Sequence, residues 1–111
     1  MSLSKNTISP IDGSVYVQRD YANQEQIDTC LEVAHKAQKD WQALPLSQRK
    51  ALCNDAVEAF VANKDTIAKE LCWQMGRPIR YAAGEVSSFA ERAEHMIAIA
   101  DSALAPLQQE E

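Results

Sequence analysis

The chain has 111 residues, a net charge of −5 and an apolar fraction of 46%, as expected for one globular domain or part of one. The negative charge argues against a general surface for nucleic acid or anionic membranes. No window approaches the roughly 20 apolar residues that a membrane span needs, and the first residues contain no apolar leader. We therefore expect a cytoplasmic protein.

Residues 6–20 predict a β-hairpin. Pro10-Ile11-Asp12-Gly13 is a strong turn signal between two short strand-like runs. Strict alternation along the second strand would put Val15 and Val17 on one face and Tyr16 on the other. Because an isolated hairpin is only marginally stable in water, it must pack on the helices that follow or on a sheet that this chain does not supply.

The first helix is expected over residues 23–44. Asn23 is a suitable N-cap with Gln26 as its capping-box partner, and Pro45 ends the helix. Apolar residues recur at helical spacing along it and predict one buried face. That face comprises Ile27, Cys30, Leu31, Ala34, Ala37, Trp41 and Leu44.

The second helix is expected over residues 47–62, with Ser47 as its cap. Arg49 and Lys50 are expected on its outer side, together with Asp55 and Glu58. Its predicted core face comprises Ala51, Leu52, Ala56, Ala59, Phe60 and Val61.

A third helix, residues 65–75, leads to Gly76, and a fourth is expected over residues 78–104. Gly76 stands where a left-handed glycine ends a helix, and Pro78 stands at a first helical position. Pro106 follows the fourth helix and leaves an acidic tail at Glu110 and Glu111. The chain is thus expected to be mainly α-helical and to form a single unit over residues 1–111.

The fourth helix is long for the size of the chain. At 1.5 Å per residue it would extend about 40 Å, whereas a compact chain of this length has a diameter of roughly 34 Å. An unbroken apolar stripe runs along it from Ala82 to Leu104. Unless another surface covers it, the overhanging part would expose Ile97, Ile99, Ala100 and Leu104. We therefore expect a partner on the Ala82 to Leu104 face, either a second copy, giving a homo-oligomer, or the rest of a larger polypeptide.

Candidate sites for metal or nucleophilic chemistry are few. Glu91 and His95 stand four residues apart, but without a third ligand they are better explained as a solvated helix pair. His35 is expected to be a partly exposed helical histidine. Cys30, Cys53 and Cys72 form an odd set without C-x-x-C spacing, which argues against disulfides and a zinc site. We therefore expect buried, reduced thiols. An apolar helix face around Cys72 argues against a nucleophilic role for its thiol.

Other features also favour structural roles. Arg77 and Arg80 flank a helix start, where anions bind, but ion pairs with neighbouring carboxylates such as Glu85 or Glu70 are the favoured interpretation. Trp41 and Trp73 fit a helical core better than a stacking surface for bases, because no basic stripe surrounds them. No glycine-rich phosphate loop and no nucleophile-elbow motif is present in the sequence.

The order of these pieces resembles the amino-terminal segment of the NAD(P)-dependent aldehyde dehydrogenases. The matching pieces cover roughly residues 6–105. They are the Asn6 to Gly13 turn, the alanine-rich helix that reaches Trp41, the Leu44-Pro45 and Arg49 junction, Glu70 followed by Gly76-Arg77-Pro78, and Glu85-Val86. The opening motif departs from the family pattern, since Thr7 follows Asn6 and the proline comes later, at Pro10.

This resemblance implies part of the α/β aldehyde dehydrogenase fold, in which the segment supplies an outer hairpin and helices. Full-length members oxidise aldehydes to carboxylic acids with NAD or NADP. The family's nucleophilic cysteine, general-base glutamate and cofactor-binding glycines lie beyond the matching segment, so the resemblance assigns no catalytic, cofactor-binding or metal-binding residue here. Two hypotheses follow: an aldehyde dehydrogenase fragment that is inactive and binds no cofactor alone, or a stand-alone helical interaction and dimerisation module.

Overall fold

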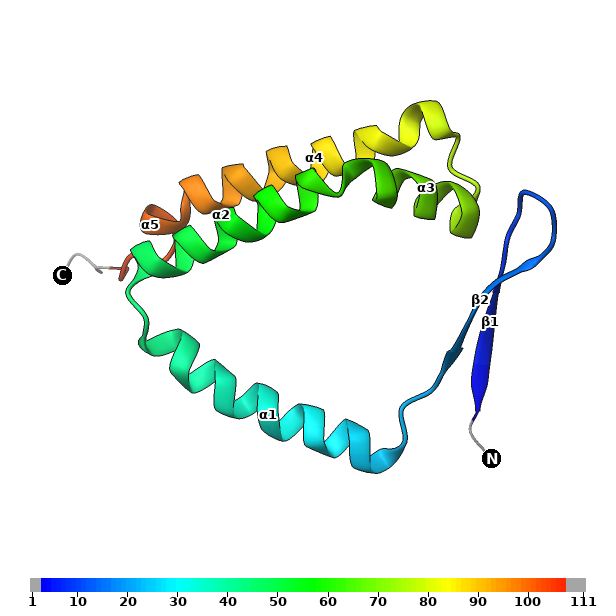
Figure 1. Ribbon diagram of the computed structural model, residues 1–111. Coiled ribbons are helices and arrows are strands. Elements are labelled where there is room, and N and C mark those ends of the chain that lie inside the picture. Colours follow the sequence, from blue (N-terminus) through cyan, green and yellow to red (C-terminus); the bar gives the residue numbers. More distant parts are fainter. Residues whose placement is uncertain (1–2, 108–111) are drawn as a thin grey trace.

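The computed structural model describes residues 3–107 and consists of a hairpin followed by helices (Figure 1). Strands β1 (Ser4–Ile8) and β2 (Val15–Asp20) pair antiparallel. The helices are α1 (Gln24–Ala43), α2 (Leu46–Ala62), α3 (Lys64–Met75), α4 (Ile79–Ala98) and the single turn α5 (Ala100–Ala103). The predicted mainly α-helical fold with an amino-terminal hairpin is confirmed, while the acidic tail at Glu110 and Glu111 lies outside the described residues.

The described part of the chain is elongated. Its radius of gyration is 19.4 Å and its extents are 63 × 40 × 28 Å, whereas a compact chain of this length would have a radius of gyration near 13 Å. Figure 1 shows the reason, because α1 diverges from the layer formed by α2, α3 and α4. The buried face predicted for the first helix is therefore wrong for the described part of the chain, since no residue of α1 is buried.

The hairpin turn forms as its sequence predicts. The Ser9 amide donates to the Ser14 carbonyl and the Gly13 amide to the Ser9 carbonyl, and Gly13 has the positive φ of 75° that glycine tolerates. The Asp12 carboxylate accepts from the Ser14 amide and hydroxyl at 3.0 and 2.7 Å. These two hydrogen bonds lower the pKa of Asp12.

The predicted alternation of β2 is wrong at Tyr16. Thr7 pairs with Val17 but Ile8 pairs with Val15, so Tyr16 is the extra residue of a β-bulge. Adjacent residues of a strand point to opposite faces of the sheet, so Thr7 and Ile8 do. Each paired residue lies on the face of its partner, so Val15 and Val17 lie on opposite faces. The bulge thus frees Tyr16 from the ladder.

Helix α4 is the centre of the core, because α2 and α3 both pack against it. Ala82, Val86 and Ala90 are buried along its inner line, and Val57 of α2 and Ala68 of α3 are the buried residues of its neighbours. The aromatic rings of Phe60 and Phe89 also meet, with centroids 4.5 Å apart. Much of the stripe expected to need a partner is therefore covered by this chain's own helices.

The orientation of α2 differs from the prediction. Its buried residue is Val57 and Cys53 is half-buried, whereas Leu52, Phe60 and Val61 of the predicted core face are exposed. Arg49 and Lys50, expected outside, are half-buried. The burial of α2 follows where α4 lies rather than the most apolar side of α2. These are corrections to the predicted core face, whose residues are Ala51, Leu52, Ala56, Ala59, Phe60 and Val61.

Of the signals predicted at Gly76, Pro78 and Ser47, one is confirmed and two are displaced. Gly76 caps α3 in the left-handed conformation, with φ 73°, as predicted. Pro78 caps α4 instead of starting it. Helix α2 begins at Leu46, one residue before the expected start, so Ser47 does not cap it and Pro45 stands at the N-cap.

The long helix predicted from Pro78 to Leu104 is divided at Ile99. Helix α4 ends at Ala98 and α5 covers one further turn. The Ser102 hydroxyl donates to the Ile99 carbonyl at 3.0 Å, a local bond that competes with regular helix geometry, and Asp101 pairs with Lys50 of α2. Neither glycine nor proline stands at this joint, so the sequence contained no conventional signal for it.

Candidate functional site

The largest polar cluster that joins distant parts of the chain links the hairpin to α3. The Tyr16 hydroxyl donates to Glu70 Oε1 at 2.7 Å, and Gln74 Nε2 donates to Glu70 Oε2 at 2.6 Å. The Tyr16 ring stacks on Trp73, with centroids 5.9 Å apart. Arg19 Nη2 donates to Gln74 Oε1 at 3.5 Å. The bulge in β2 and two turns of α3 bring these side chains together.

The contacts of this cluster favour the ionised form of Glu70, which accepts the hydrogen bonds. The hydrogen bonds from Tyr16 and then Gln74, followed by the charge of Arg19, lower the pKa of Glu70. The hydrogen bond between Tyr16 and Glu70 also raises the pKa of Tyr16. A general base needs a carboxylate that gains a proton near neutral pH, so the shift of Glu70 runs opposite to that need. The cluster fastens the hairpin to α3.

The turn of the hairpin also packs against the carboxyl end of α3. Ser9 is completely buried, and a Cβ built on Gly76 would lie 2.9 Å from Cγ of Pro10. A side chain at position 76 would thus collide with the hairpin turn. These contacts support the first of the two predicted alternatives, in which the hairpin packs on the helices that follow.

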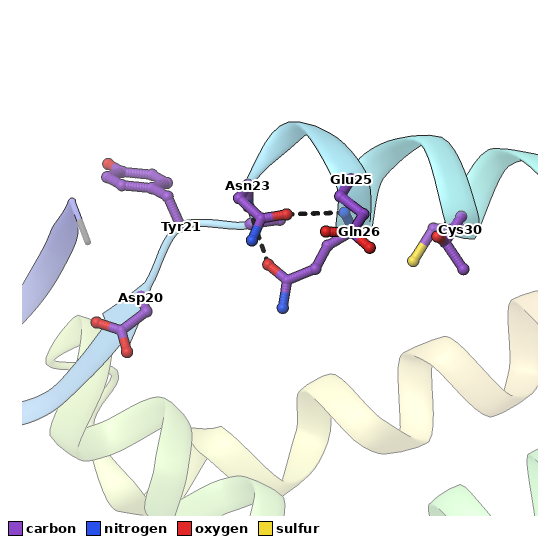
Figure 2. Close-up of a pocket in the computed structure, with 8 residues that line it drawn as sticks. Asp20, Tyr21, Asn23, Glu25, Gln26 and Cys30 are labelled. Atoms are coloured by element: carbon purple, nitrogen blue, oxygen red, sulfur yellow. Dashed lines mark hydrogen bonds between the residues drawn. The ribbon is translucent and has the colours of Figure 1, made fainter. Parts of the chain in front are cut away.

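A pocket of about 720 Å³ lies where β2 passes into α1 (Figure 2). The Asn23 side chain accepts from the Gln26 amide at 2.8 Å, while the Asn23 amide donates to Gln26 Oε1 at 2.9 Å. This is the predicted capping box. The polar groups of Asn23 and Gln26 are therefore already hydrogen-bonded in the cap that begins α1. The pocket is lined by this cap together with Tyr21 and Cys30, and it does not present a set of convergent reactive groups.

Within the described residues, the candidates for metal binding and nucleophilic chemistry do not lie in a cluster of suitable side chains. Within residues 3–107, no group of three or more histidine, cysteine or acidic side chains could hold a metal ion. Glu91 and His95 are both exposed on α4, and His35 is exposed on α1. The three cysteines are free, but the expected burial is wrong: Cys30 is exposed, and Cys53 and Cys72 are half-buried.

The ion pairing predicted for the arginines at the start of α4 is confirmed for Arg77, whereas within residues 3–107 Arg80 contacts an aromatic ring instead of a carboxylate. Arg77 Nη2 lies 2.7 Å from Glu85 Oε1, and the Arg80 guanidinium lies over the Tyr81 ring, 4.7 Å from its centroid. Trp73 stacks on Tyr16 and Trp41 lies at the end of α1. These positions assign structural contacts to the arginines and to Trp73.

A second, smaller pocket was not indicated by any sequence motif. It has a volume of about 230 Å³ and is formed by the last turn of α1, the first turn of α2, the end of α4 and α5. Its lining is mostly apolar and includes Arg49, whose Nε is buried without a hydrogen-bond partner in the described part of the chain. Its residues are Trp41, Leu46, Arg49, Lys50, Cys53, Met96, Ile97, Ala100 and Leu104.

No helix within residues 3–107 combines the length and the apolar content needed to cross a membrane. The Ala82 to Leu104 face predicted to bind a second copy is buried at Ala82, Val86 and Ala90. Ile99 and Leu104 remain exposed at its end. The homo-oligomer therefore stays a prediction, with less free surface on this face than the sequence suggested.

Comparisons with known proteins match nearly the whole chain. The model of the aldehyde dehydrogenase family matches residues 2–109. A long-chain-aldehyde dehydrogenase from Acinetobacter sp. is 31% identical over 75 residues, which are 68% of this chain and 15% of that protein. A 3,6-anhydro-alpha-L-galactose dehydrogenase from Vibrio sp. (strain EJY3) is 32% identical over 89 residues, which are 78% of this chain and 18% of that protein.

A solved structure shares the fold. The crystal structure of an NAD-dependent benzaldehyde dehydrogenase from Corynebacterium glutamicum superposes with a TM-score of 0.85 at 22% identity. The match covers 98% of this chain but 24% of the other. This chain thus spans less than a quarter of the length of each of these proteins.

Proposed function

Because this chain belongs to the aldehyde dehydrogenase family, we propose that it is the amino-terminal structural part of an enzyme that oxidises aldehydes to carboxylic acids with NAD or NADP. It supplies scaffold and contributes no catalytic, metal-binding or cofactor-binding residue. The observation that carries the proposal is the match of residues 2–109 to the family model. The fold likeness to a chain of which it covers 24% supports the same role.

The geometry of the described residues supports a scaffold role. Within residues 3–107, several polar contacts hold one part of the chain to another, among them Tyr16 with Glu70, Arg77 with Glu85, and Lys50 with Asp101. Oxidation of an aldehyde in this family needs a nucleophile, a base and a bound nicotinamide. The nucleophile candidate Cys72 is half-buried in α3, next to Trp73, on which Tyr16 of the hairpin stacks.

Two assays test this proposal. The purified chain is mixed with NAD or NADP and with benzaldehyde or a long-chain aldehyde, and reduction of the cofactor is followed by absorbance. We expect no turnover, and no heat of NAD binding in calorimetry. Turnover by the 111-residue chain would contradict the scaffold role.

The second assay asks whether the chain can replace a family segment. In a chimera, this chain takes the place of the matching segment of the Vibrio sp. dehydrogenase, and the rest of that enzyme follows it. We expect a soluble chimera that reduces NAD or NADP with 3,6-anhydro-α-L-galactose. A chimera that is insoluble or inactive, beside an active parent enzyme, would count against the proposal.

A further inference from the structure

Two cationic side chains stand directly opposite each other on the hairpin. Lys5 of β1 is the register partner of Arg19 of β2, and cross-strand partners share one face of the hairpin with their Cβ atoms about 5 Å apart. Like charges in this position destabilise a strand pair. Because the whole chain has a net charge of −5, the pair concentrates positive charge locally on an acidic protein.

Neither cation has a carboxylate partner within residues 3–107, where the ion pairs belong to the chain after the hairpin. The Arg19 guanidinium uses neutral acceptors instead: Nη1 donates to Thr7 Oγ1 at 3.3 Å and Nη2 to Gln74 Oε1 at 3.5 Å. Glu70 of α3 feels the charge of Arg19, but its oxygens accept from Tyr16 and Gln74. The guanidinium is thus oriented without being neutralised.

The two cations line a pocket of about 370 Å³ near the end of the hairpin that lies opposite its turn. Thr7, Tyr21 and Ala22 line it as well, and its one acidic residue is Asp20. The Tyr21 amide donates to the Leu3 carbonyl at 2.8 Å, which continues the strand pairing past the pocket. The lining combines an excess of positive charge with an aromatic side chain, at a volume typical of sites for small organic ligands.

We propose that this pocket binds the phosphate group of a small soluble phosphate monoester, held by Lys5, Arg19 and Thr7. Such a group carries nearly two negative charges at neutral pH and has three strong acceptor oxygens, which match two cations and one hydroxyl. The Thr7 oxygen accepts from Arg19, so the hydroxyl hydrogen is available to the phosphate. The organic part of the ligand lies against Tyr21. This inference does not rest on the proposed function.

Titration of the purified chain with phenyl phosphate, followed by nuclear magnetic resonance, tests the site. We expect saturable shifts of the backbone amides of Lys5, Thr7 and Arg19. Lys5→Gln should raise the dissociation constant about tenfold, because it removes one charged donor. The matched control, Lys36→Gln, removes the same charge from an exposed position on α1 and should change the dissociation constant by less than about twofold, since distant surface charges are screened.

Two further comparisons separate the parts of the ligand. Benzoate has the same ring but a single charge and two oxygens, so it should bind at least about threefold more weakly than phenyl phosphate. Tyr21→Ala should weaken phenyl phosphate by about threefold or more, because an aromatic contact is lost. The same variant should leave the affinity for inorganic phosphate unchanged.

Lys5→Glu distinguishes a binding role of Lys5 from a structural one. It replaces repulsion across the strands by attraction to Arg19, so the unfolding temperature in phosphate-free buffer should rise by about 1–4 °C. Phenyl phosphate should raise the unfolding temperature of the unmodified chain by mass action and should have no such effect on Lys5→Glu. Circular dichroism verifies that each variant is folded.

Three results would overturn the inference. Equal affinities of Lys5→Gln and Lys36→Gln, or shifts spread evenly over the cationic residues of the chain, would mean that no site exists at the hairpin. Benzoate binding as tightly as phenyl phosphate would make the site a general anion site. If vesicles containing phosphatidic acid shift the hairpin amides while phenyl phosphate does not, the partner is a membrane surface and our assignment is wrong.

Discussion

Helices α1 and α4 both have 20 residues and an apolar stripe, yet they have opposite fates in this structure. Helix α4 buries Ala82, Val86 and Ala90 against α2 and α3, while α1 buries nothing. Periodicity alone cannot separate them, because it reports that a helix has an inner side and not whether the same chain covers that side. The comparison teaches that two amphipathic helices of one polypeptide can differ in whether the described part of the chain covers them.

The largest expected effect comes from placing a charge in the packed helix. Val86 is 1% exposed, so Val86→Asp buries a carboxylate without a partner and should abolish cooperative unfolding of the chain, at a cost of about 3–5 kcal/mol. Circular dichroism during urea titration measures this. Ser87→Asp puts the same residue at the next, exposed position and should change stability by less than about 0.5 kcal/mol. Equal stability of the two variants would contradict the burial of Val86 in the packed unit.

Gly76 tests how the hairpin is held against the packed helices. Its φ of 73° is unfavourable for alanine, whose Cβ would also lie 2.9 Å from Cγ of Pro10. Gly76→Ala should therefore destabilise the chain by about 1–3 kcal/mol. Gly84 is a matched control inside α4 with open space around it, and Gly84→Ala should stabilise by about 0.5–1 kcal/mol. Urea midpoints that shift in the same direction would contradict this interpretation.

The Tyr16 contact with Glu70 predicts a pH dependence. The pKa of Glu70 is lowered from an ordinary value of 4.5, so its ionised form favours the folded state. This stabilisation is therefore complete above pH 4.5 and is lost as the pH falls through the lower, folded-state pKa. Fluorescence of Trp73, which stacks on Tyr16, should report release of the hairpin in acid.

Tyr16→Phe provides the control for that pH dependence. It keeps the ring on Trp73 but removes the hydroxyl donor, so it should flatten the acid loss of stability and cost about 1 kcal/mol at neutral pH. Tyr21→Phe, at an exposed tyrosine in the β2 to α1 connection, should leave the acid transition unchanged. If Tyr16→Phe titrates like the unmodified chain, the contact with Glu70 does not control the attachment.

The smallest effect is expected on α1. In the isolated chain, Leu31→Glu removes little buried area and should change the free energy of unfolding by less than about 0.5 kcal/mol. The Val86→Asp variant of α4 provides the opposite limit under the same conditions. A loss above about 2 kcal/mol for Leu31→Glu would mean that α1 packs within the isolated chain, and the contrast between the two helices would disappear.

Short-range chemistry, which the sequence displays by itself, determined much of this protein. The hairpin turn at Asp12 and Gly13, the capping box of Asn23 and Gln26, and the left-handed Gly76 depend on residues within a few positions of one another. Such signals can be predicted because the interacting groups are adjacent in the sequence. The family resemblance also depended on the order and spacing of short pieces, which can be read along the chain directly.

Tertiary structure decided the rest, since those features depend on atoms far apart in the chain. The bulge that frees Tyr16 matters only because Glu70 and Trp73 lie beside it. The buried side of α2 is set by where α4 lies, and the pocket at Arg49 exists only where four elements meet. The sequence itself determined that α1 and α4 are amphipathic, but packing determined that α4 is covered by this chain and α1 is open, because burial requires a surface and not merely a pattern.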